Sequence, residues 1–231
     1  MTFLELKTRV ATYSGERDTT KAGYAVNDAL NMIHNAIKWP FMLIPGTALT
    51  MVAGTQQYSL PSNFKFPHEF WYRNATIGAP QYLLPVTRKL DNVNDGPPER
   101  YRIKKAAAGS GATKSAWVVE FEAIPSTAFV AQYPTIEFDY YYKPADLSAD
   151  ADVPQLDEAD HSIIVWGAVT LLTAKQDDAG AFQMFASMWE KGYQDIIQNA
   201  IDFYGEGVVV APGQEVTGER VSRVSDYGRT S

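Results

Sequence analysis

The chain has 231 residues, of which 45% are hydrophobic and 20% charged, so it can bury a sizeable core and is neither a disordered tail nor a disulfide-stapled miniprotein. It contains no cysteine, which excludes thiol catalysis, disulfides and cysteine-ligated metal sites. Its net charge of −7 opposes broad contact with phosphates, so we do not expect it to bind nucleic acid. No apolar run approaches the roughly 18 residues of a membrane span, and the first ten residues lack the features of a signal peptide. We therefore expect a soluble chain made in the cytoplasm, with no membrane partner.

Two helices are predicted at the start of the chain. Thr2 with Glu5 three residues later matches a capping box, and an apolar stripe on one helical face follows until Gly15. A second helix ends at Trp39-Pro40, because proline disfavours helical geometry in the residue before it. The apolar stripe of this second helix consists of Val26, Leu30, Ile33 and Ile37.

The middle of the chain has a different sequence pattern from the segments before it. From residue 41 to about 142 it consists of short runs rich in β-branched and aromatic residues, separated by proline and glycine. So many short strands without helices between them predict an antiparallel sandwich or barrel. The expected strands span residues 41–44, 48–52, 57–60, 69–72, 81–87, 100–103, 117–121 and 135–142.

Helical patterns return after a connector that contains proline and aspartate. Asp157 is a plausible N-cap, and residues 163–172 are apolar on nearly all sides, which predicts a buried central helix. A longer helix with a wide aromatic face follows, and Gly205 is its expected stop. Residues 206–231 mix glycine, serine and charges of both signs and cannot build a core, so we expect a flexible tail.

These elements predict an α+β fold. Neither the first two helices nor the last two have enough partners by themselves, so we expect residues 1–40 and 150–205 to form one helical bundle. Residues 41–149 would then be an inserted β-rich domain, either an antiparallel β-sandwich or a barrel.

The glycine-rich run at residues 107–115, AAGSGATKS, resembles a phosphate-binding loop at first sight. A true loop of this type needs two glycines at fixed positions before Lys-Ser and must join a strand to a helix. Here Ala108 and Thr113 occupy the two glycine positions, and a strand rather than a helix is predicted to follow. We therefore interpret the run as a flexible hairpin tip and expect no nucleotide cofactor.

The acid-rich run at residues 148–161 is a candidate metal site. It does not follow the calcium-loop pattern, and Pro154 interrupts it, so we favour a structural role for acids placed before a helix N-terminus. The three histidines, His34, His68 and His161, are not part of any recognisable hydrolase pattern. We expect no catalytic residue, no metal and no cofactor.

Three stretches, taken in order, resemble the head-to-tail adaptor (connector) proteins of tailed bacteriophages. The first is 27–41, a helix that ends in a Trp-Pro turn, and the second is the strand end Tyr58-Ser59-Leu60-Pro61. The third runs from Asp139-Tyr140-Tyr141-Tyr142-Lys143-Pro144 to Gly167-Ala168. Together they cover roughly residues 20–175, and their shared order makes coincidence less plausible than for any one of them.

The resemblance implies a structural virion protein without catalysis. A helical domain would dock on the portal protein, and a β domain would face the next tail component, a nozzle or tail tube protein. About twelve copies would close a ring by heterologous contacts, and DNA would pass through its channel without specific binding.

The resemblance also suggests interface residues. The expected portal or subunit interface consists of Phe182, Phe185, Trp189, Tyr193, Tyr204, Val208, Val209, Val210, Arg220 and Arg223. The expected tail-facing loop carries Lys104, Lys105 and Lys114.

Two other functions remain open at this point. Another tail-completion protein would bind tail proteins but not the portal. A hydrolase of cell-envelope polysaccharide would need a cleft with two carboxylates at catalytic separation.

Overall fold

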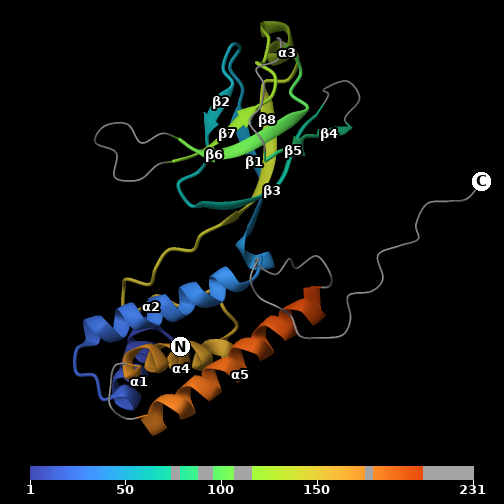
Figure 1. Ribbon diagram of the computed structural model, residues 1–231. Coiled ribbons are helices and arrows are strands. Elements are labelled where there is room, and N and C mark those ends of the chain that lie inside the picture. Colours follow the sequence, from blue (N-terminus) through green and yellow to red (C-terminus); the bar gives the residue numbers. More distant parts are fainter. Residues whose placement is uncertain (74–78, 88–95, 107–115, 175–178, 205–231) are drawn as a thin grey trace, which may run out of the picture.

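The computed structural model describes residues 1–73, 79–87, 96–106, 116–174 and 179–204 (Figure 1). In these parts the chain is α+β, as the sequence predicts. Figure 1 shows the long helices gathered in one layer and the strands gathered in another, with two chain segments running between the layers.

The N-terminal helices begin and end where local chemistry requires. Helix α1 (Phe3–Ser14) has the predicted capping box, and its C-cap Gly15 has φ of 70°, in the left-handed region that favours glycine. Helix α2 (Thr19–Ala36) begins at Asp18, whose carboxylate accepts hydrogen bonds from two backbone N–H groups of the first turn. It ends before Trp39, and Pro40 then opens the short 3-10 helix η1 (Pro40–Met42).

The C-terminal helices are α4 (His161–Thr173) and α5 (Ala179–Tyr204), preceded by the 3-10 helix η2 (Glu158–Asp160). Asp157, predicted as an N-cap, holds the N-cap position of η2 rather than of α4, where Asp160 stands, and neither side chain makes a capping hydrogen bond. The intervening 3-10 turn, which periodicity does not reveal, moves the helix start by three residues.

Helix α4 is the centre of the helical layer. It packs against α1, α2 and α5, and most of its residues are buried. The largest fully buried side chains of this core include Leu6, Val10, Val26, Ile33 and Ile164. Each such side chain contributes about 1.5 to 3 kcal/mol to stability on removal from water. The connector after the strands is tied to α2 as well, because the Asn27 side chain donates to the Leu147 carbonyl (3.0 Å) and accepts from its N–H (2.9 Å).

The strands form two four-stranded sheets. The first has the order β1 (Leu43–Thr50), β8 (Thr135–Tyr142), β3 (Phe64–Arg73) and β4 (Pro80–Tyr82), and all of its pairs are antiparallel. The second has the order β2 (Gln57–Ser59), β7 (Trp117–Phe121), β6 (Arg100–Lys105) and β5 (Leu84–Pro85). Its β5–β6 pair is parallel. Neither sheet closes on itself within the described residues, so the barrel alternative is wrong for this part of the chain, and a purely antiparallel arrangement is too.

Alternating side chains of β8 and β3 form part of the hydrophobic core between the two sheets. Ile136, Phe138 and Tyr140 are buried at every second position of β8. The Phe138 ring stacks on Phe70 with centroids 4.8 Å apart, and Phe70 meets Tyr101 of the second sheet at 4.5 Å. These aromatic contacts therefore join the two sheets.

Several local features differ from the predicted elements, and the strand expected at 81–87 is divided between β4 and β5 of different sheets. The two strands expected at 41–44 and 48–52 are one edge strand, β1, with a bulge where Gly46 has φ of 64° and donates its N–H to the Asp139 carboxylate (2.7 Å). A short helix, α3 (Thr127–Gln132), was not predicted; Ser126 caps it, and its buried Phe129 packs edge-on against Tyr72.

Gly167 on α4 allows close contact with two other helices, because a Cβ placed there would lie 2.6 Å from the Trp189 ring of α5 and 3.1 Å from Ala29 of α2. We expect Gly167→Val to lower the free energy of unfolding by about 1 to 3 kcal/mol through overpacking, measured by urea denaturation. The control Ser187→Val adds the same side chain on the exposed face of α5 and should change stability by less than about 1 kcal/mol. Equal losses in both variants would contradict this account.

Candidate docking surfaces

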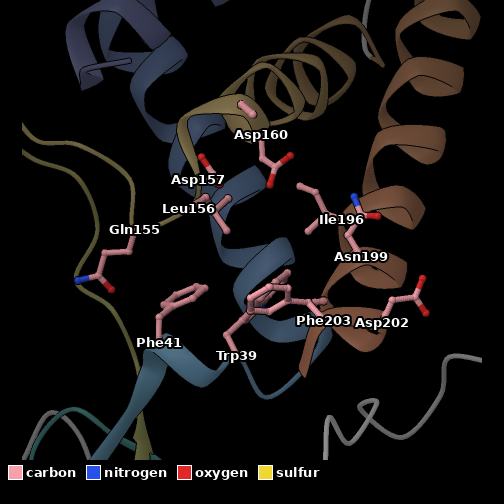
Figure 2. Close-up of a pocket in the computed structure, with 12 residues that line it drawn as sticks. Trp39, Phe41, Gln155, Leu156, Asp157, Asp160, Ile196, Asn199, Asp202 and Phe203 are labelled. Carbon is pink, nitrogen blue, oxygen red and sulfur yellow. The ribbon is translucent and has the colours of Figure 1, made fainter. Parts of the chain in front are cut away.

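A groove of about 740 Å³ opens where the C-terminal ends of α2 and α5 meet the segment before α4 (Figure 2). Its apolar lining comes from three separate parts of the chain: Trp39, Phe41, Leu156, Ala159, Ile196, Ala200 and Phe203. Its volume is in the range of about 300 to 1,000 Å³ that is typical of binding pockets. The groove can therefore receive several apolar side chains.

The Trp-Pro turn fixes one wall of this groove. Trp39 is 4% exposed, and its indole N–H donates to the Ile33 carbonyl in the last turn of α2 (2.9 Å). The Phe41 ring stacks on Trp39 with centroids 5.5 Å apart. The aromatic wall is thus preorganised by a hydrogen bond and by stacking.

Acidic residues line the rest of the groove. The side chains of Asp157, Asp160 and Asp202 line it, and none of its lining residues is basic. Burial raises the pKa of Asp160, and the charge of Asp157 raises it further. Asp202 accepts a hydrogen bond from Gln198 (2.8 Å). The arrangement favours a partner that offers apolar side chains together with positive charge.

The aromatic face of α5 serves mainly the helical core. Phe185 and Trp189, which we expected at a portal or subunit interface, are 7% and 9% exposed and pack inside the chain. Phe182 and Tyr193 are half-buried on the same helix. The Trp189 ring packs against α4 at Gly167, so this part of the stripe finds a partner within the chain. The Tyr204 side chain and the expected interface residues Val208, Val209, Val210, Arg220 and Arg223 lie outside the described residues.

Lys104 and Lys105 lie in strand β6, whereas we expected both in a loop. Lys104 pairs with the Glu120 carboxylate at 2.6 Å, and Arg102 pairs with its other oxygen. Burial raises the pKa of Glu120, but the hydrogen bonds from Lys104 and Arg102 outweigh it and hold the pKa below its ordinary value. Lys105 lies over the Trp117 ring at 5.2 Å. Lys114 and the run 107–115 are outside the described residues.

The acid-rich run before α4 forms hydrogen bonds within the connector and an ion pair with α1. The Asp152 carboxylate accepts from the N–H groups of Ser148 (2.7 Å) and Ala149 (2.8 Å), and Asp150 pairs with Lys7 at 2.7 Å. These bonds give the run the structural role we expected. No group of three or more metal-binding side chains occurs in the described ranges, and none of the helices there could cross a membrane.

His34 lies at the junction between the helices and the strands. It is 4% exposed; its carbonyl accepts a hydrogen bond from Lys65 of β3 (2.7 Å), and its ring Nε2 has no hydrogen-bond partner in the described structure. Burial, with a smaller effect from the Lys65 charge, lowers the pKa of His34 to about 4. His34 is therefore a neutral residue of the junction at pH 7.

The family model of the SU10 adaptor proteins matches residues 1–211. The chain belongs to the SU10 adaptor protein family. This family assigns it to the structural adaptor proteins of phages and so to the components of the virion that contact other head and tail proteins, a role that implies no enzymatic activity. No curated protein matches the chain.

The match to the SU10 adaptor family spans every described helix and strand and both sides of the groove. The groove itself was missed at the level of sequence. The sequence shows the Trp-Pro turn and the acids before α4. Their positions in the chain do not indicate that residues 39, 157 and 202 lie together. Only the packing of α5 beside α4 brings them together.

The pKa of His34 predicts a pH-dependent stability. Between about pH 6.5 and 4 the unfolded chain binds a proton at this residue and the folded chain does not, so stability falls as the pH is lowered through this range. From pH 6.5 to 5 the loss reaches up to about 2 kcal/mol. In urea unfolding at both pH values, His34→Gln should reduce that loss, although burial also lowers the pKa of His161, so a part remains. The control is His68→Gln, an exposed site; the account fails if His34→Gln retains the full wild-type pH dependence.

Proposed function

We propose that this SU10-family protein is a head-to-tail adaptor that docks on the portal and joins it to the next tail component, a nozzle or tail tube protein. The observation that carries the proposal is the family match over residues 1–211. The helices and strands gathered in separate layers support it, because an adaptor must present different surfaces to two partners. The copies would be made in the host cytoplasm and incorporated into the virion.

The proposal gives each layer a partner. The helical domain, residues 1–40 and 150–205, docks on the portal, and the inserted β-rich domain, residues 41–149, faces the tail. Two features support this division: the helices and the strands have separate hydrophobic cores, and the chain crosses between them near Trp39 and again after Tyr142. Each layer can therefore change its surface without disturbing the core of the other.

About twelve copies form a closed ring around a DNA channel in this proposal. The net charge of −7 favours a channel that repels DNA and lets it pass without specific binding. Residues 206–231 would become ordered only on the portal or on a neighbouring copy, as segments that fold on binding do.

Native mass spectrometry tests the portal role directly. The purified chain is measured alone and after mixing with the portal ring of the same phage. We expect the portal ring to gain about twelve copies, because closure into a ring is coupled to docking. A chain that binds isolated tail proteins and never the portal would be a tail-completion protein, and the adaptor proposal would be wrong.

Deletion of residues 206–231 tests the role of the C-terminal segment. The described residues of both hydrophobic cores lie before residue 206, so we expect unchanged thermal melting, while the copy number on the portal should fall below detection in the same mass measurement. Full portal binding by the truncated chain would show that the segment has no part in docking.

A further inference from the structure

The turn between α1 and α2 presents an exposed corner with two aromatic rings and three cations. Tyr13 is 54% exposed and Tyr24 67% exposed, and both lie within one or two turns of the loop at 15–18. The cations Arg9, Arg17 and Lys21 are exposed on the same two helices and on the turn that joins them. We call these five residues the basic corner.

The acids of the same region are already engaged locally. Glu16 accepts a hydrogen bond from the Asp18 N–H (2.9 Å) and lies 3.7 Å from the Lys21 ammonium, and Asp18 caps α2. Neither Arg9 nor Arg17 forms an ion pair with an acid in the described part of the chain. The basic corner therefore offers positive charge to an external acid.

The turn between α1 and α2 lies at one end of the helical layer, and the C-terminal ends of α2 and α5, which line the groove, lie at the other (Figure 1). Helix α2 begins at the basic corner and leads to Trp39 in the groove wall, so its 18 residues separate the two surfaces by about 27 Å. A chain whose helices are packed rigidly cannot bring its own corner to its own groove. Two complementary surfaces at opposite ends of one molecule are what a head-to-tail contact between identical copies requires.

We propose that the groove of one copy receives the basic corner of the next. Tyr13 and Tyr24 enter the aromatic groove between Trp39 and α5, and the cations of the corner meet Asp157, Asp160 and Asp202. This inference rests on the ring of the proposed function and specifies which surfaces close it. The contact is heterologous, so each copy uses its groove once and its corner once.

The apolar contacts and the charge pairs of the two surfaces contribute differently to the proposed interface. The aromatic groove excludes water and provides most of the contact energy, as buried aromatic anchors do in interfaces. The charge pairs remain near solvent, where they add little affinity but fix the partner and the orientation. Asp160 already has a raised pKa from burial and from the Asp157 charge, and a cation placed between them removes that repulsion.

Cysteine cross-linking tests the contact cleanly, because the natural chain contains no cysteine. One variant carries Arg17→Cys in the corner, and a second carries Asp202→Cys at the groove. Both sites are exposed. The two are mixed and treated with a short bis-maleimide, both bound to the portal and as concentrated free protein. We expect a cross-linked dimer from the mixture and a ladder of multimers from a chain that carries both cysteines.

The matched control replaces Asp202→Cys by Glu190→Cys, which is exposed in the middle of α5. This pair should give at least about tenfold less cross-linked dimer, since α5 is a single straight element and residue 190 lies more than three turns from residue 202. Equal yields from both pairs would indicate random collision and would overturn the contact.

The outcomes separate this inference from the adaptor role. Full loading of the portal without the Arg17–Asp202 cross-link, in either state, refutes the contact and leaves the adaptor role intact. A cross-linked ladder from free protein that never joins the portal supports the contact and refutes the adaptor role.

Another occupant of the groove would be the C-terminal segment of the same chain, which carries Arg220 and Arg223. A chain with Arg220→Cys and Asp202→Cys tests this in dilute solution. An intramolecular cross-link there, together with no cross-link between copies, overturns the proposal.

Charge reversal provides a second readout that does not depend on a reagent. Arg17→Glu with Lys21→Glu should weaken self-association at least about tenfold in low salt, measured by analytical ultracentrifugation. Adding Asp157→Lys and Asp202→Lys should restore association, because the signs again match. Failure of the restored chain to associate, while its melting temperature is unchanged, would count against the pairing of these two surfaces.

Discussion

The close packing of α4 against its three neighbours determines the rest of the helical layer. This helix is apolar on nearly all faces, and Gly167 lets the Trp189 ring of α5 approach it where any larger residue would collide. Helices from both ends of the chain are thereby held around one element. The same contact places the end of α5 beside the segment before α4 and beside Trp39. The groove is a consequence of this packing.

The strands are linked to this layer through a junction with few polar bonds. Lys65 of β3 donates to the carbonyl of His34, and Asn27 of α2 holds Leu147 of the returning connector. Trp39 and Tyr141 belong to the core of the helical layer although they lie next to the junction in sequence. The two layers thus keep separate hydrophobic cores and are joined at the junction by a small number of specific bonds.

In the proposed contact, one end of the helical layer carries the groove and the other end carries the basic corner that enters the groove of the next copy. In the proposed contact, a layer with complementary ends propagates from copy to copy without a change of shape, and the angle between the two surfaces would set the curvature of the proposed ring. Among the aromatic residues of α5, Phe185 and Trp189 are buried in the core, whereas Phe203 at its end is exposed and lines the groove. In the described residues the proposed assembly surfaces therefore lie at helix ends.

The sequence by itself determined the helices with clear caps, the α+β class and the resemblance to phage adaptors. The capping box at Thr2, the stop at Trp39-Pro40 and the alternation of Ile136, Phe138 and Tyr140 are local patterns, and local patterns depend only on neighbouring residues. Tertiary structure alone decided that Trp189 packs against α4, that β1 continues through Gly46, and that residues 39, 157 and 202 share one groove. The reason is physical: burial and groove formation depend on which faces meet in space, and chain spacing carries no information about contacts between distant elements.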